Sequence, residues 1–123
     1  MDIRKAKSIT HFIPEEKKEG YPYALSANLF QTGQLCIYSE KVRPGSKSSA
    51  PHYHESIDEV VYVLEGELVA VEGDEECTLN ENDAVCFKAN SKKLHYLENR
   101  SNQIAKFLLI RKQISEKDVI YEV

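Results

Sequence analysis

The sequence predicts an all-β fold that closes into a barrel or a jelly roll, and three observations indicate it. From residue 24 onward, short apolar runs rich in β-branched and aromatic residues alternate with turn signals. No window of about 11 residues carries a helical period bounded by capping residues. With so many strands in 123 residues, closure of the sheet is the natural way to hide its edges.

The strands are expected in order along the chain, each bounded by turn residues. The expected strands span residues 34–42, 59–64, 67–72, 75–79, 84–87, 95–99 and 104–112. Arg43-Pro44-Gly45 ends the first, and Gly73-Asp74 separates the third from the fourth. Only Glu65-Gly66 stands at the junction of the second and third runs. These two runs are therefore predicted to form a hairpin with a very tight connection.

The length of the chain fits one domain with a core that needs no disulfide. Residues 1–23 are polar and rich in turn residues, and we expect them to form an N-terminal arm. Residues 24–112 are expected to form the barrel. Residues 113–123 form a tail that could add a strand at an edge of the barrel.

Composition excludes several classes of function. A formal net charge of −4 argues against a nucleic-acid-binding surface, which needs clustered Lys and Arg. No run approaches the roughly 20 apolar residues of a membrane span, and the N-terminus is too polar for a secretory signal. Cys36, Cys77 and Cys86 form an odd set inside strand-like runs, where cysteine is usually a buried apolar group. We expect a cytoplasmic protein that binds neither nucleic acid nor membrane.

Three of the four histidines fall in the β region, and two of them are separated by a single residue. Because side chains alternate along a strand, His52 and His54 point to the same side. Glu59 opens the next run and shares a face with Val61 and Val63, so it can face the same interior. Asp58 is the alternative acidic residue, but alternation places it on the opposite face.

A divalent cation would explain why an interior holds these groups. A buried carboxylate without a partner is costly, and so is a pair of unsatisfied imidazoles. Neutral imidazole nitrogen and carboxylate oxygen are both metal ligands, and two histidines with one carboxylate leave positions open for water or substrate. A fourth ligand would have to come from a distant strand, and His95 is the remaining histidine of the β region.

The segment "SAPHYHESIDEVVYVLEG" resembles the first motif of the cupin superfamily, G-x5-H-x-H-x3–4-E-x6-G. Gly45, His52, His54, Glu59 and Gly66 occupy the motif positions. One extra residue stands between the first glycine and the first histidine.

The segment "NDAVCFKANSKKLHYLEN" resembles the second motif, G-x5-P-x-G-x2-H-x3-N, less closely. Asn82, Lys88 and Asn90 replace Gly, Pro and Gly, and the gap before His95 is longer by two residues. His95 and Asn99 keep the final spacing. Asparagine is the non-glycine residue that best accepts left-handed backbone angles, so the two Gly-to-Asn replacements are expected to be mild.

The resemblance implies a double-stranded β-helix, the cupin or jelly-roll barrel, of the small single-domain cupins of undefined activity. It implies that His52, His54, Glu59 and His95 bind one divalent transition metal ion, whether Fe, Mn, Zn or Ni. It also implies a homodimer. A cupin-shaped barrel whose polar pocket holds only water is the alternative.

Three functions would follow from such a site. The metal could be Fe²⁺ that activates O₂ in a dioxygenase. It could be a Lewis acid that polarises a carbonyl for isomerisation or decarboxylation. The pocket could also bind or sense a small oxygen-rich, anionic or chelating molecule without turnover. Lewis-acid chemistry needs a positioned general acid or base, and the spacing identifies none, so enzyme and binding protein both stay open.

Overall fold

The computed structural model describes residues 1–13, 20–113 and 116–122. The expected N-terminal arm includes residues 14–19, and the expected C-terminal tail includes residues 114–115 and 123; these parts lie outside the described residues. No helix within the described part of the chain is long and apolar enough to cross a membrane.

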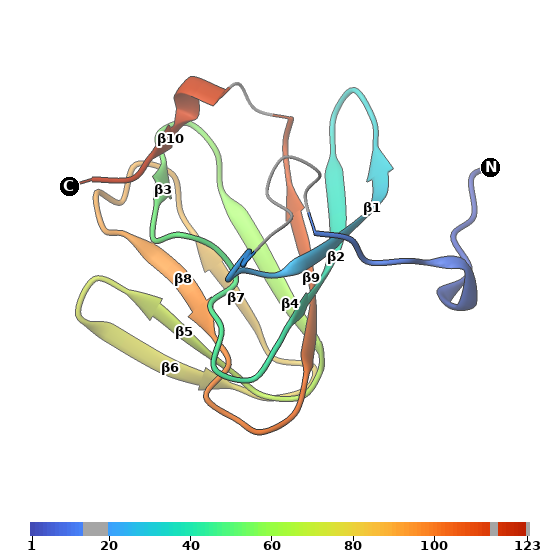
Figure 1. Ribbon diagram of the computed structural model, residues 1–123. Coiled ribbons are helices and arrows are strands. Elements are labelled where there is room, and N and C mark those ends of the chain that lie inside the picture. The colour runs from blue at the N-terminus through green and yellow to red at the C-terminus, as the bar shows by residue number, and fades with distance from the viewer. Residues whose placement is uncertain (14–19, 114–115, 123) are drawn as a thin grey trace.

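The described residues form two main antiparallel sheets that face one another (Figure 1). The five-stranded sheet has the order β1 (Leu25–Gln31), β2 (Cys36–Val42), β9 (Ala105–Arg111), β4 (Glu59–Glu65) and β7 (Ala84–Phe87). The three-stranded sheet has the order β6 (Glu75–Leu79), β5 (Leu68–Glu72) and β8 (His95–Glu98). A small sheet pairs β3 (Tyr53–His54) with β10 (Val119–Ile120), and two 3-10 turns, η1 (Ala6–Ser8) and η3 (Glu116–Asp118), complete the described elements. The fold is a double-stranded β-helix, and the predicted fold class is confirmed.

The core lies between the two sheets and follows from alternation along the strands. On β4, Val61 and Val63 are buried while their sequence neighbours on the other face are exposed or half-buried. Phe107 of β9 joins them from the same sheet, and Leu68 and Leu97 meet them from the opposite sheet. Glu59 belongs to the inward face of β4, so the apolar core gives way to polar groups at the beginning of that strand.

The predicted hairpin of residues 59–64 and 67–72 is wrong. β4 pairs with β7 and β9, whereas β5 pairs with β6 and β8, so the connection carries the chain from one sheet to the other. Gly66 makes this crossing possible. Its φ is +79°, and a Cβ at this position would lie 3.0 Å from the Cα atom of Ala105. The sequence indicates a sharp turn there but not which sheet each strand joins.

The asparagines of the second motif adopt the backbone angles expected of them. Asn82, in the turn before β7, has a φ of +71°, and Asn90, in the loop before β8, has a φ of +56°. Asn99 is fully buried, and its side-chain amide donates hydrogen bonds to the carbonyl oxygens of Val42 and Gln103. Asn99 therefore ties the end of β8 to the neighbouring sheet.

The cysteines differ in their surroundings, although burial was expected for all three. Cys36 is buried, whereas Cys77 on β6 and Cys86 on β7 are exposed. β6 and β7 are each the last strand of their sheet, and the side chains at these positions face solvent. A position in an edge strand therefore did not mean that the cysteine side chain was buried.

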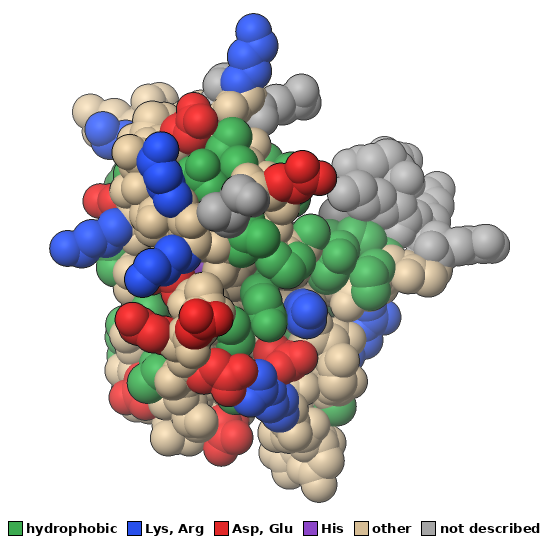
Figure 2. All heavy atoms as spheres, turned by 90° about the vertical axis from the view of Figure 1, so that its left-hand side faces the viewer, with side chains coloured by type: hydrophobic (Ala, Val, Ile, Leu, Met, Phe, Trp, Pro, Cys, Tyr) green, Lys and Arg blue, Asp and Glu red, His purple; other side chains and the backbone are tan. Residues whose placement is uncertain are grey.

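Charge is unevenly distributed over the face that carries β3, β8 and the β5–β6 hairpin. In Figure 2, Lys and Arg side chains predominate in the upper left part of this face, and Asp and Glu side chains predominate in its lower part. Both signs of charge therefore occur on the same face.

Candidate metal site

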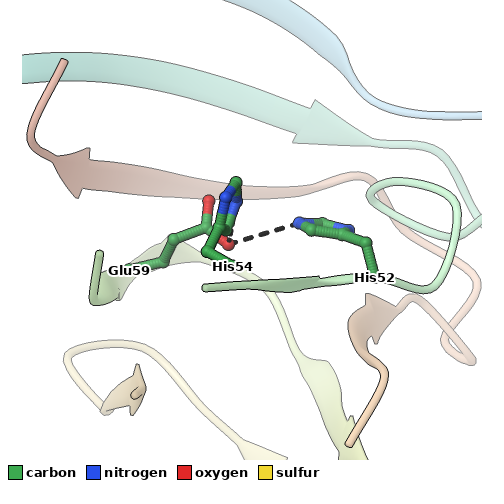
Figure 3. A group of neighbouring side chains, drawn as sticks. All are labelled: His52, His54 and Glu59. Atoms are coloured by element: carbon green, nitrogen blue, oxygen red, sulfur yellow. Dashed lines mark hydrogen bonds and ion pairs between the residues drawn. The ribbon is translucent and has the colours of Figure 1, made fainter. Parts of the chain in front are cut away.

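Four side chains meet at the polar end of the barrel. Three of them come from strands, and the fourth comes from a residue that pairs with a strand through an isolated bridge. His54 lies on β3, Glu59 is the first residue of β4, and His95 is the first residue of β8. His52 forms an isolated antiparallel bridge with His95, so the backbones of these two histidines are directly paired. Figure 3 shows His52, His54 and Glu59 with their side chains pointing toward one another.

All three histidines face a single oxygen atom, Glu59 Oε1. The Nε2 atoms of His52, His54 and His95 lie 3.3 Å, 3.1 Å and 2.9 Å from it. The ligand atoms of His52, His54 and Glu59 all lie within 4.8 Å of one another, so these three form a group that could hold a metal ion. His95 is not part of that three-residue group and joins it through the shared carboxylate oxygen.

The site is sheltered from solvent, and this governs its charges. Glu59, His54 and His95 are buried, while the side chain of His52 keeps 13% of its surface exposed. Burial alone would raise the pKa of Glu59, but hydrogen bonds from the three histidines outweigh it and hold the pKa well below its usual range. Glu59 is therefore ionised, as a metal ligand must be.

The histidines respond differently to the same environment. Burial tends to lower the pKa of His52, but its contacts with Glu59 and the Ala50 carbonyl outweigh burial, so the pKa is raised. For His95, burial prevails over the contact with Glu59, and the pKa is lowered. A lowered pKa favours the neutral imidazole, which is the form that binds metals.

The second ring nitrogen of two histidines has a defined partner. His52 Nδ1 lies 2.8 Å from the carbonyl oxygen of Ala50, which can only accept a hydrogen bond. His54 Nδ1 lies 3.1 Å from Oδ2 of Asp118, a carboxylate. Each Nδ1 therefore carries the hydrogen, and in the neutral ring the Nε2 lone pair is directed at Glu59.

His95 is held by packing instead. Its ring stacks on Phe87 with the two ring centres 4.0 Å apart and the planes nearly parallel. Within the described part of the chain, its buried Nδ1 has no hydrogen-bond partner. Stacking fixes the plane of this ring and leaves Nε2 directed at the carboxylate.

These donors fit a divalent transition metal. Two ligand atoms that are each about 2.1 Å from an ion, at right angles to one another, lie about 3.0 Å apart. The three nitrogen–oxygen separations lie close to that value. Without a cation, each of these contacts needs a proton on the Nε2 atom that faces the carboxylate, and a bound cation would take the place of those protons. Three nitrogens and one oxygen are the donors that first-row divalent ions accept.

Asp58, the alternative acidic residue, belongs to a different interaction. Its Oδ1 atom accepts a hydrogen bond from the backbone N–H of Ala89 at 2.8 Å on the exposed side. The structure thus directs Glu59, and not Asp58, toward the histidines. The full metal-ligand set of four residues stays a prediction.

A cavity of about 70 Å³ opens beside three of the four residues, and its wall includes a carboxylate that the sequence reasoning missed. The walls include His52, Glu59 and His95 together with apolar side chains such as Phe107. Glu40 of β2 lines the same cavity. It lies opposite Phe107 in the β2–β9 register, and cross-strand partners share a face of the sheet. Alternation with the buried Val42, two residues on, was the signal that could have placed Glu40 inside.

Asp118 is the second residue that the sequence reasoning missed. It is buried and contacts His54 across a separation of 64 residues. It lies in a polar tail, and nothing in its sequence neighbourhood marks it as part of a site. Such a contact becomes apparent only when the pairing of β10 with β3 is known.

Comparison with known proteins places this barrel and its histidines in one family. The family model described as "Cupin domain" matches residues 38–111, which is more than half of the chain and includes His52, His54, Glu59 and His95. The chain belongs to this family. No curated protein matches the sequence.

Solved structures show the same relationship. A sugar phosphate isomerase of the cupin superfamily from Silicibacter pomeroyi is 28% identical, with a TM-score of 0.80 over 92% of this chain and 76% of that chain. A protein from Thermus thermophilus is also 28% identical, with a TM-score of 0.73 over 91% of this chain and 97% of that one. A predicted oxalate decarboxylase from Thermotoga maritima shares the fold at 21% identity, with a TM-score of 0.76 over 92% of this chain and 100% of that chain.

Proposed function

We propose that the protein is a metal-dependent enzyme that moves a proton on a small oxygen-rich molecule, by isomerisation or decarboxylation. His52, His54, Glu59 and His95 would hold one divalent ion, either Fe, Mn, Zn or Ni. The bound ion would act as a Lewis acid that polarises a carbonyl group of the ligand. The observation that carries the proposal is the second carboxylate, Glu40, in the wall of the same cavity.

Glu40 has the position and the environment of an acid–base group. No hydrogen bond or ion pair between described residues reaches its carboxylate, so the group is available to a ligand in the cavity. Burial and the negative charge of Glu59 raise its pKa to about 7, while Arg111 and His52 oppose the shift. A catalytic acid–base group works best when its pKa is close to the working pH.

In an isomerisation, Glu40 would act on the carbon next to the carbonyl group. Its carboxylate takes the proton from that carbon, and the resulting carboxylic acid returns the proton to the neighbouring carbon. The hydroxyl proton passes between the two oxygens in the same direction, so the reaction needs no oxidant or reductant.

Size and likeness support a small substrate. A cavity of about 70 Å³ offers several times the space of one water molecule. The similar protein from Silicibacter pomeroyi is a sugar phosphate isomerase, and isomerisation of a small hydroxy-carbonyl compound is the same kind of reaction. We therefore favour this class over oxygen activation by Fe²⁺.

Elemental analysis of protein purified without chelator tests the metal site. We expect about one transition metal ion per chain in the wild type, and loss of the metal after His52→Ala together with His54→Ala. A wild type without stoichiometric metal, or a double variant with undiminished metal, would reject the site.

Proton exchange in D₂O tests the reaction. Aldose and ketose phosphates of three to six carbons are incubated with metal-loaded protein, and deuterium incorporation is followed by NMR. Glu40→Gln should keep the metal and lose exchange by at least about 100-fold, whereas Glu67→Gln, at an exposed residue outside the cavity wall, should not. Exchange by the Glu40 variant at the wild-type rate would contradict its role.

Measurements of ligand binding and oxygen uptake separate the alternatives. Ligand binding without exchange for any compound would favour a binding or sensing cupin. Oxygen uptake with Fe²⁺ and a diketone or a phenol would favour a dioxygenase.

We also propose that the protein works as a homodimer in the cytoplasm. None of its three cysteines is in a disulfide, as a reducing compartment requires. The surface proposed for dimer formation is considered in the Discussion.

A further inference from the structure

We propose that Asp118 is a positioning residue of the metal site, and that the C-terminal segment of residues 116–121 is therefore part of that site. The proposal rests on the metal site described under the proposed function. The segment lies beyond the matched family region, which ends at residue 111. The family match therefore assigns no role to this segment.

Asp118 is fixed by contacts on both of its carboxylate oxygens. Oδ2 lies 3.1 Å from Nδ1 of His54. Oδ1 accepts hydrogen bonds from the backbone N–H of Ser56, at 2.8 Å, and from the Ser56 hydroxyl. The carbonyl oxygen of Asp118 also accepts a hydrogen bond from the backbone N–H of Glu55 at 3.0 Å. The side chain is 7% exposed, so these contacts are sheltered from water.

The backbone of the tail maintains this arrangement. β10 begins directly after Asp118 and pairs antiparallel with β3, with Val119 opposite His54 and Ile120 opposite Tyr53. The ring of Tyr121 then lies 6.1 Å from the ring of His52, centre to centre. The tail therefore follows the strand that carries His54 and reaches the neighbouring histidine.

The carboxylate has a specific effect on His54. A carboxylate oxygen accepts hydrogen bonds, so Nδ1 of His54 would donate its hydrogen to Asp118 and Nε2 would offer its lone pair to a bound cation. The negative charge also makes Nε2 a stronger donor to a metal. Of the three histidines, His54 is the one whose second nitrogen has a charged partner: His52 contacts a backbone carbonyl, and within the described residues His95 Nδ1 has no partner.

An asparagine at this position cannot reproduce these contacts. Asp118 supplies two acceptor oxygens for two separate groups of donors, whereas an amide offers one oxygen and an NH₂ group. Asp118→Asn keeps the size of the side chain but leaves either His54 or Ser56 facing an N–H group. We expect weaker metal binding and an altered ligand field, not merely a less stable tail.

The test uses Co²⁺, whose absorption spectrum reports on its ligands. The full chain is freed of metal with a chelator, and Co²⁺ affinity and the visible spectrum of the Co²⁺ protein are measured. Asp118→Asn should weaken Co²⁺ binding by about 10- to 100-fold and change the spectrum of the bound ion. Ser56→Ala removes one of the groups that hold Asp118 and should weaken binding by a smaller factor.

Asp83→Asn is the matched control. Asp83 also accepts a hydrogen bond from a backbone N–H, that of Asn80 at 2.8 Å, but it contacts no histidine. Its Co²⁺ affinity and spectrum should equal those of the wild type. Thermal unfolding of the metal-free proteins measures the structural effect of each substitution separately.

The outcomes are distinct. Wild-type affinity and an unchanged spectrum in both Asp118→Asn and Ser56→Ala would overturn the inference while leaving the metal site in place. An equal loss in Asp83→Asn would also overturn it, because the effect would then be general. A wild type that binds no Co²⁺ would overturn the proposed function as well. If Asp118→Asn does not fold, the affinity of Ser56→Ala relative to Asp83→Asn decides.

Discussion

The side chains around Glu59 illustrate how much a few residues determine at this site. One carboxylate oxygen receives contacts from three imidazoles, and each histidine is oriented in a different way. A backbone carbonyl orients His52, a carboxylate orients His54, and a stacked phenylalanine ring orients His95. The site is therefore held by three unrelated interactions, and loss of one leaves the other two histidines oriented.

The pH dependence of stability follows from Glu40. Its pKa is raised from 4.5 to about 7, so the folded protein retains a proton that the unfolded chain has released. This contribution is complete below pH 4.5 and is lost as the pH rises toward 7. The Glu40→Gln variant has no carboxyl group at this position, so it does not lose this stability as the pH rises. The free energy of unfolding of the metal-free variant, relative to that of the metal-free wild type, should therefore be higher at pH 8 than at pH 4.5, by up to about 3 kcal/mol.

Urea unfolding in the presence of a chelator measures this difference at the two pH values. Glu67→Gln, outside the cavity, should show no such change between them. A stability difference between the Glu40 variant and the wild type that is the same at both pH values would contradict the explanation.

At the level of residues, the sequence indicated the histidines better than the carboxylates. The sequence places His52 and His54 two positions apart in an extended segment, so a shared face was predictable. The burial of Glu59 and its contact with the histidines agree with the alternation of β4. Glu40 was detectable in principle by the same alternation. Asp118 was not, because its contact with His54 depends on long-range pairing of the tail.

Among the elements, the crossing between β4 and β5 has the strictest steric requirement. Gly66 combines a positive φ with close contact to the backbone of Ala105. Gly45 has the same φ of +79°, but a Cβ at Gly45 would meet no atom within 4 Å beyond its chain neighbours. Substitution of the two glycines therefore distinguishes the free-energy cost of the backbone conformation from the cost of steric overlap.

Alanine substitution tests this separation. Gly45→Ala should cost about 1–2 kcal/mol, the price of a left-handed conformation for an L-residue. Gly66→Ala should cost more, because Ala105 must also move. The free energy of unfolding from denaturant titration measures both. Equal losses for the two variants would show that the contact with Ala105 is unimportant.

The same crossing explains where prediction of elements succeeded and failed. Most strand positions follow from local composition: the expected runs 75–79 and 84–87 coincide with β6 and β7, whereas no strand was expected at β1. The pairing of strands depends on distant segments. A two-residue turn between apolar runs fits a hairpin and a crossing between sheets equally well, so the local pattern could not decide between them.

For the whole molecule, the outer face of the five-stranded sheet is the surface proposed for dimer formation. β4 and β9 carry apolar side chains on both faces, a pattern of strands covered on both sides. On the outer face, Val60 lies opposite Ile110 and Tyr62 opposite Leu108. Val60 and Tyr62 remain 36% and 37% exposed. A second copy that covers this face would bury a continuous apolar surface.

Sedimentation velocity at micromolar concentration tests the dimer. We expect a dimer for the wild type and a monomer for Val60→Asp, because a charge would be buried at the centre of the interface. Leu35→Asp, at an exposed position in the turn between β1 and β2, is the control and should stay dimeric. A monomeric wild type would reject the proposal.

The bridge between His52 and His95 has a consequence for how an ion enters the protein. Two backbone hydrogen bonds, of 2.7 Å and 3.2 Å, join these residues regardless of what their rings bind. The two histidines are thus held side by side before an ion binds, and capture of an ion requires little ordering of the chain. Uptake should be governed by access through the cavity mouth, and the amide hydrogens of both residues should exchange slowly in the empty and the loaded protein alike.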